Sequence, residues 1–171
     1  MLDLGITQED FYADHFEKNV WLRRGALAQP AIDWTQLDDT LYRIEPREPA
    51  VTLYRNGLVP AMQYTQSTVE FGAPRQRFSK ARFYQQLTDG ATLVINRIEN
   101  HLPAVRRLCI AIARFVGQPA VSNSYLSFRG DGTFGRHWDT HDVFALQLLG
   151  RKRWQVFRPT FALPLAHHKS D

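Results

Sequence analysis

The sequence contains a single cysteine, Cys109, and has neither a leader-like start nor a long apolar run. One cysteine cannot form an internal disulfide, and scarce cysteine is typical of proteins in a reducing compartment. Residues 1–5 lack the charged segment and apolar stretch that open a signal peptide. A bilayer-spanning helix needs roughly 20 apolar residues, and no run approaches that length. We therefore expect a cytoplasmic protein without a membrane partner.

The chain also lacks a concentrated block of charge. It has 21 Lys and Arg against 17 Asp and Glu, a net charge of +4 and a pI of about 9.5. This balance permits contact with RNA or a ribosome. The basic residues are spread along the sequence, however, at 23–24, 75–82, 106–107 and 151–153. We therefore do not expect direct nucleic acid binding, and a basic RNA- or ribosome-binding domain stays a minor alternative.

What is present is typical of a globular protein, since 44% of the residues are hydrophobic and 22% are charged. We expect a single domain over residues 1–171. Helices are predicted over residues 7–19, 34–44, 80–87 and between Asn100 and Gly117, with Thr7, Asp33, Ser79 and Asn100 as N-caps. Strands are predicted at 21–25, 51–54 and 91–98, and residues 60–78 are predicted to be a long irregular loop.

Residues 121–157 contain the candidate functional residues. They are predicted to form three extended segments, with a polar loop between the first two. In the first segment Asn123 and Tyr125 share a face, because alternate strand residues point the same way. The second, residues 142–149, is an apolar run that ends at Gly150. The third, residues 151–157, alternates, so Lys152 should point inward with Trp154 and Val156 and need an anionic partner.

His137 and Asp139 lie two residues apart and would share a face of an extended chain. A neutral imidazole beside a carboxylate supplies two of the three ligands of a 2-His-1-carboxylate iron site. The tripeptide alone is a weak signal, because many such pairs lie on solvated loops.

Other patterns point to ordinary structural roles. The glycine-rich residues 130–135 lack the Lys-Ser/Thr ending of a phosphate-binding loop, and His137 and His141 lack the Glu of a helical zinc motif. Asp142 would face away from Asp139, and Gln147 should meet a polar partner. His101 is expected to be solvated, and Cys109 to be a small apolar residue of a helix.

The segment HWDTHDVFALQLLGRKRW (137–154) resembles the core of the JmjC-type cupin oxygenases, in particular their ribosomal-oxygenase, cupin-4-like branch. The segments FYADHFEKNVWLRRG (11–25), DGATLVINRIE (89–99) and VSNSYLSFRGDG (121–132) are similar to that branch too. The resemblance implies an α+β chain with part of a double-stranded β-helix, or jelly-roll. Residues 1–118 would form an N-terminal α/β part, and residues 119–171 the first half of the β-helix core.

The same resemblance implies an Fe(II)/2-oxoglutarate-dependent dioxygenase that uses O2 to hydroxylate a protein side chain, of the ribosomal-protein arginine or histidine type. His137 and Asp139 would bind the metal. Lys152 would pair with the distal carboxylate of 2-oxoglutarate, and Asn123 and Tyr125 would help to hold this cosubstrate. The partner would be a protein substrate, and a ribosomal protein is one candidate.

The chain departs from the family pattern in its third metal ligand, a histidine expected far downstream. Only His167 and His168 follow His141, in a tail with no strand signal. We therefore expect the N-terminal part of such an oxygenase, with an exposed apolar edge that promotes homodimers or aggregates. Whether this chain is active alone stays open. The alternative is a truncated, non-catalytic cupin-fold interaction module.

Overall fold

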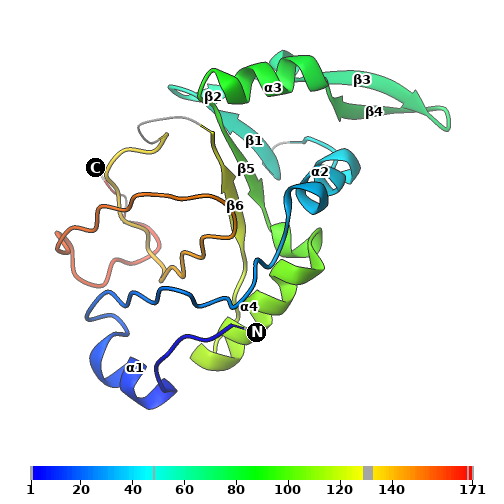
Figure 1. Ribbon diagram of the computed structural model, residues 1–171. Helices are drawn as coiled ribbons and strands as arrows, with labels where there is room; N and C mark the ends of the chain where they lie inside the picture. The colour runs from blue at the N-terminus through cyan, green and yellow to red at the C-terminus, as the bar shows by residue number, and fades with distance from the viewer. Residues whose placement is uncertain (1, 48, 129–132, 169, 171) are drawn as a thin grey trace. The chain divides into compact units, whose positions relative to one another are not determined.

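A computed structural model of the chain describes residues 2–47, 49–128, 133–168 and 170. The chain divides into two compact units. One is continuous, Trp34–Thr133, and the other combines the two ends of the chain, Met1–Asp33 and Phe134–Asp171. The helices and strands of both units are labelled in Figure 1.

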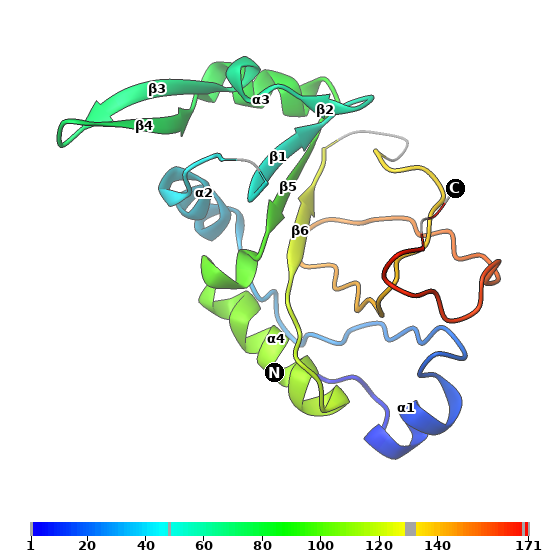
Figure 2. The ribbon, with the colours of Figure 1, turned by 180° about the vertical axis from the view of Figure 1, so that it is seen from behind.

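The continuous unit is built on a four-stranded antiparallel sheet in the order β2-β1-β5-β6 (Figures 1 and 2). Its strands are β1 (Val51–Tyr54), β2 (Leu58–Val59), β5 (Thr92–Asn96) and β6 (Asn123–Leu126). β-branched and aliphatic residues dominate β1 and β5, as is usual for strands buried on both faces. The strands predicted at 51–54 and 91–98 are thus confirmed, and β6 forms within the predicted first segment.

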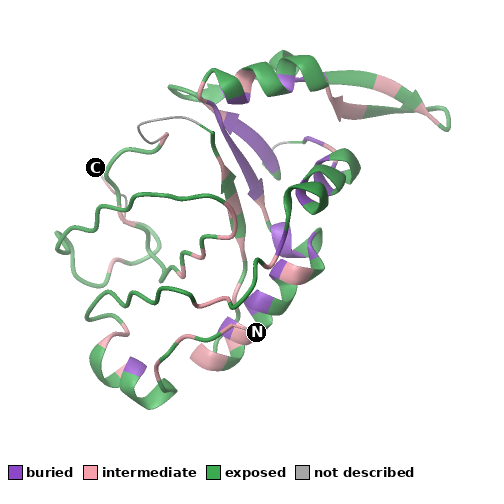
Figure 3. Ribbon diagram, viewed as in Figure 1, coloured by how far each residue is buried: buried purple, intermediate pink, exposed green. Residues whose placement is uncertain are grey.

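The core of this unit lies on β1 and β5, which are largely buried in Figure 3. Leu53 lies opposite Leu93 in the register, and both are 0% exposed. Val51 lies opposite Ile95 and is buried as well. Burial of each such side chain contributes about 1.5–3 kcal/mol, so this strand pair stabilises the unit and fixes the position of β6 next to it.

Residues 65–78 form a ribbon, so the prediction of an irregular loop over 60–78 is wrong. Strands β3 (Thr65–Glu70) and β4 (Ala73–Phe78) pair through a two-residue turn at Phe71-Gly72. Both turn residues have positive φ, +52° and +76°, the backbone that tight hairpins require. The ribbon is anchored by the ring of Phe78, whose centroid lies 4.4 Å from that of Phe83.

The predicted helices of this unit are confirmed with small shifts. They are α2 (Trp34–Arg43), α3 (Lys80–Thr88) and α4 (Pro103–Val116), and Gly117 ends the last with a φ of +63°. The predicted cap Asn100 lies instead in a short 3-10 helix, Ile98–Asn100, and Leu102 occupies the N-cap position. Ser79 holds its predicted N-cap position but makes no capping hydrogen bond through its side chain.

The unit made from the two chain ends has one helix, α1 (Gln8–Asp14), among its described residues. Thr7 caps it as predicted, since its hydroxyl accepts a hydrogen bond from the Asp10 N–H at 3.0 Å. The helix ends five residues before the predicted end. Phe11 is buried, and its ring lies 5.9 Å from that of Phe144. The strand predicted at 21–25 does not form.

The second and third extended segments predicted for 121–157 also lack strand structure. No residue described between 127 and 168 belongs to a strand. Half-buried and exposed residues still alternate here, as in a strand. Phe144, Leu146 and Leu148 are half-buried, and the residues between them are exposed. A strand needs a neighbour that pairs with its N–H and C=O groups. Without such a neighbour, these segments stay irregular.

The fold is therefore of mixed α and β structure with small antiparallel sheets, which is compatible with part of a jelly-roll. The partial double-stranded β-helix over residues 119–171 and the single-domain organisation stay predictions. No helix in the described part of the chain combines the length and the apolar character needed to cross a bilayer.

Candidate functional site

His137 is exposed and has a defined tautomer. Its Nδ1 lies 2.8 Å from the carbonyl oxygen of Gly135. A carbonyl oxygen can only accept, so Nδ1 is the donor, and in the neutral imidazole Nε2 then keeps its lone pair. Metal-ligating histidines usually donate one ring N–H to a carbonyl or carboxylate in this way, which fixes the ring for the other nitrogen to bind a metal. The donor chemistry of His137 therefore fits a metal ligand.

Asp139 is also exposed, and its carboxylate is a suitable hard ligand for Fe(II). Trp138, between the two, is held on the C-terminal tail. The centroid of its ring lies 5.6 Å from that of Phe161, in a stacked arrangement. Its backbone N–H donates a hydrogen bond to the Ser170 hydroxyl at 3.2 Å. His137 and Asp139 are thus left at the surface on either side of an anchored tryptophan.

Across the described residues, no group of three or more His, Cys, Asp or Glu side chains could hold a metal ion. The predicted pair is two ligands, so this finding leaves the pair itself a prediction. His168 does not complete the set in its present geometry. Its Nδ1 accepts a hydrogen bond from the Leu165 N–H at 2.8 Å, so the proton is on Nε2 and neither nitrogen has a free lone pair.

Lys152 is exposed, and the prediction that it points inward is wrong. Trp154 and Val156 are 57% and 63% exposed, so the face that should have been buried is not. The prediction assumed a paired strand, and the pairing is absent among the described residues. The ammonium group of Lys152 lies over the ring of Trp154, so these two side chains share a face as predicted.

Asn123 and Tyr125 lie on β6, where exposure alternates. Both are exposed, and Ser124 and Leu126 between and after them are half-buried. The prediction that Asn123 and Tyr125 share a face is consistent with this alternation. The side-chain oxygen of Asn123 accepts a hydrogen bond from the Arg97 N–H at 3.3 Å. Because a backbone N–H can only donate, this contact requires the amide oxygen, and it leaves the NH2 group of Asn123 on the other side.

Glu99 is a buried carboxylate that the sequence analysis missed, and it lies against the residue that precedes β6. It is 6% exposed and accepts hydrogen bonds from Ser122 and Arg97. Burial raises the pKa of Glu99, but the hydrogen bonds from Ser122 and Arg97 outweigh it, so that the pKa lies below its ordinary value. An acid directly after the apolar strand 91–98 was the available sequence signal.

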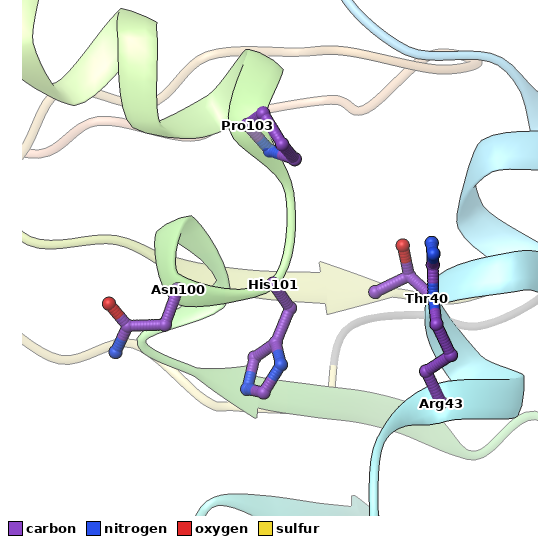
Figure 4. A pocket seen from close by; sticks show the side chains of 5 residues that line it. All are labelled: Thr40, Arg43, Asn100, His101 and Pro103. Carbon is purple, nitrogen blue, oxygen red and sulfur yellow. The ribbon is translucent and has the colours of Figure 1, made fainter.

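A hollow of about 320 Å³ lies elsewhere in the continuous unit, between the end of α2 and the start of α4 (Figure 4). Its lining consists of Thr40, Arg43, Asn100, His101 and Pro103. None of the five predicted site residues lines it.

The remaining alternatives keep structural roles. Gln147 finds its polar partner locally, since its amide donates to the Leu149 carbonyl at 2.8 Å. Cys109 is buried on α4, as expected for an apolar helix residue. Residues 130–132 of the glycine-rich loop at 130–135 lie outside the described residues.

Residues 94–171, which include all five predicted site residues, match the JmjC domain family. Residues 94–171 are therefore JmjC-domain sequence. No solved structure matches the chain.

Several curated relatives share one description, bifunctional lysine-specific demethylase and histidyl-hydroxylase NO66. The protein from Drosophila mojavensis is 24% identical over 97% of this chain, and the one from Drosophila persimilis is 32% identical over 93%. The protein from Caenorhabditis elegans is 43% identical over 34% of the chain. These matches span 18%, 23% and 8% of the relatives' own lengths, so the chain corresponds to a minor part of each.

Proposed function

We propose that this JmjC-domain chain is part of an Fe(II)- and 2-oxoglutarate-dependent oxygenase that hydroxylates a protein side chain. The main support for the proposal is the hydrogen bond of the His137 ring, together with the position of His137 inside the matched residues 94–171. Its Nδ1–H donates to the Gly135 carbonyl, and in the neutral imidazole Nε2 keeps the lone pair that a metal ligand requires.

Each predicted residue has a stated part in this proposal. His137 Nε2 and the Asp139 carboxylate bind the metal, which the family uses in general together with 2-oxoglutarate. Lys152 pairs with the distal carboxylate of 2-oxoglutarate, and Asn123 and Tyr125 help to hold it. When bound, the metal would activate O2, and 2-oxoglutarate would supply two of the four electrons needed to reduce it, with the substrate side chain supplying the other two. The chain supplies ligand geometry and charge.

The substrate is proposed to be a protein. The relatives' names describe action on lysine and histidine side chains, and a ribosomal protein with a target arginine or histidine fits the branch that the sequence resembles. A cytoplasmic location and a homodimer belong to the same proposal.

One observation favours a second candidate, a non-catalytic interaction module of the same fold. The described residues hold no three-ligand group, so catalysis would need a ligand from elsewhere. A nucleic-acid-binding role has less support. Six arginines are paired with carboxylates at 3.4 Å or less, and these pairs reduce the free positive charge: Arg23, Arg47, Arg55, Arg75, Arg77 and Arg97.

The test is a titration of this chain with Mn(II), a redox-stable substitute for Fe(II), with and without 2-oxoglutarate. We expect metal binding that strengthens with 2-oxoglutarate and is lost in His137→Ala and Asp139→Asn. The matched control is Asp142→Asn, which removes an exposed carboxylate three residues away and should leave binding unchanged. Metal binding that is absent, or equal in all variants, would overturn the proposal in favour of the interaction module.

A further inference from the structure

Glu99 is the one buried carboxylate among the residues that the structure describes. It lies in the 3-10 helix Ile98–Asn100, which joins β5 to α4. A buried charge is costly unless hydrogen bonds replace its water. The positions of its partners therefore indicate what this charge holds in place.

Both oxygens of Glu99 are used. Oε2 accepts from the N–H of Ser122 at 3.1 Å and from its hydroxyl at 2.8 Å. Oε1 accepts from Nε of Arg97 at 2.5 Å. One carboxylate thus connects the segment after β5 to the residue that directly precedes β6.

Ser122 is held on a third side as well, since its carbonyl accepts from the Ile98 N–H at 3.1 Å. The backbone entering β6 is therefore fixed through a donor, an acceptor and a side chain. Because Asn123 follows Ser122 directly, the direction of its side chain depends on this anchor.

Arg97 completes the arrangement from the other side. Its φ is +56°, a left-handed backbone that is strained for a residue with a Cβ. This backbone presents its N–H to the side-chain oxygen of Asn123 at 3.3 Å, and the Glu99 carboxylate holds its guanidinium. Glu99 thus acts on both groups that set the amide of Asn123.

We propose that Glu99 is a positioning residue: through Ser122 and Arg97 it fixes the orientation of the side-chain amide of Asn123, a residue that the proposed function assigns to 2-oxoglutarate. This inference rests on the proposed function for the identity of the ligand. The orientation of Asn123 is a property of the chain alone and can be measured without any ligand.

The first measurement is the side-chain amide of Asn123 by NMR in the chain without metal or cosubstrate. Its two N–H signals are assigned by their loss in Asn123→Ala. In Glu99→Gln the new amide keeps an oxygen for Ser122 but places an NH2 group against Nε of Arg97, donor against donor. We expect the Asn123 signals to shift and to average toward those of a freely rotating amide. Unchanged signals in a folded Glu99→Gln chain would overturn the proposal.

The second measurement is 2-oxoglutarate affinity in the Mn(II) complex, as a double-mutant cycle. We expect Glu99→Gln and Asn123→Ala each to weaken binding about tenfold, and the double variant to be no weaker than Asn123→Ala, because both act through one contact. Mn(II) affinity without 2-oxoglutarate should not change. Additive losses would show a merely structural Glu99 and overturn the proposal.

These experiments distinguish failure of the proposed function from failure of the positioning role of Glu99. If the wild-type chain binds no 2-oxoglutarate, the proposed function and the ligand part of this inference fail, and the NMR result decides whether Glu99 orients Asn123. If the wild type binds and the losses add, only the inference fails. Should Glu99→Gln not fold, Ser122→Ala removes the hydroxyl bond alone and should give the same amide shift and a smaller loss. Unchanged signals in folded Ser122→Ala would then refute the proposal.

Discussion

The ammonium nitrogen of Lys152 lies 4.4 Å from the ring centroid of Trp154. Exposed cation–π contacts contribute about 0.5–1 kcal/mol, which is weak enough for a carboxylate ligand to displace. A carboxylate of 2-oxoglutarate can therefore compete with the ring for the ammonium group of Lys152 in the proposed enzyme.

Lys152→Ala should raise the KM for 2-oxoglutarate about tenfold or more in the full-length oxygenase and change that for the protein substrate far less. The reason is the loss of the one cation assigned to the distal carboxylate. Steady-state turnover with each substrate varied in turn measures this. Trp154→Phe is the control, since it keeps an aromatic ring beneath the cation. Equal effects on both KM values would contradict the assigned role.

His137→Ala and Asp139→Ala should each abolish metal-dependent turnover in the full-length protein with little loss of fold. Both side chains are exposed, and substitutions at exposed positions usually change stability by no more than about 0.5 kcal/mol. Thermal unfolding followed by circular dichroism measures the fold alongside activity. Retained turnover in either variant would refute the ligand assignment.

Leu93→Ala should destabilise the continuous unit by about 2–5 kcal/mol, because it opens a cavity opposite Leu53 where neither leucine is exposed. Leu163→Ala is the matched control. That leucine is 66% exposed, and its truncation should cost less than about 0.5 kcal/mol. Urea unfolding gives both values. Similar losses in the two variants would contradict the location of the core on β1 and β5.

Glu99 should make stability depend on acid pH. Its pKa in the folded chain lies below its ordinary value of 4.5, so its charge stabilises the fold above the unfolded pKa, and this contribution is lost as the pH falls through the folded pKa. We expect the Tm of the wild type to fall more steeply than that of Glu99→Gln below about pH 4.5. Parallel curves for the two chains would exclude a stabilising carboxylate at this position.

The chain should associate in solution. Many of its large apolar side chains are at least two-fifths exposed in the C-terminal stretch: Val143, Trp154, Val156, Phe157, Phe161, Leu163 and Leu165. Exposed apolar surface of this kind promotes dimers or aggregates. Sedimentation velocity over a range of concentrations measures this. A monodisperse monomer throughout would count against the interpretation of the chain as an incomplete barrel.

Elements that depend on local signals were predictable from the sequence. Thr7 starts α1, Gly117 ends α4, and the apolar stretch at 91–98 contains β5, because caps, glycines and burial act within a few residues. The ribbon β3–β4 was missed because its residues are mostly polar and exposed. Its signal was the turn at Phe71-Gly72, and a phenylalanine is a rare choice for a left-handed position.

At the candidate site, the structure depends on residues that are distant in the sequence and was not predicted. The alternation around Lys152 predicted a paired strand, but pairing depends on a neighbour that local sequence cannot supply. Glu99 was missed for a related reason. Its burial follows from the approach of Ser122, 23 residues away in the chain. An acid directly after the apolar strand is a signal of burial, but it does not identify the partner. The sequence suggests which residue types to propose for the site, but it does not predict the contacts that orient them.

The unit formed by the two chain ends has a consequence for the order of folding. Phe11 meets Phe144 only after the intervening chain has been synthesised, whereas Trp34–Thr133 is continuous and contains its own core. Closing a loop of that length costs roughly 4 kcal/mol in chain entropy, and non-local contacts form slowly. During translation the continuous unit can therefore fold first. Once it has folded, less chain entropy is lost when Phe11 of α1 forms its contact with Phe144.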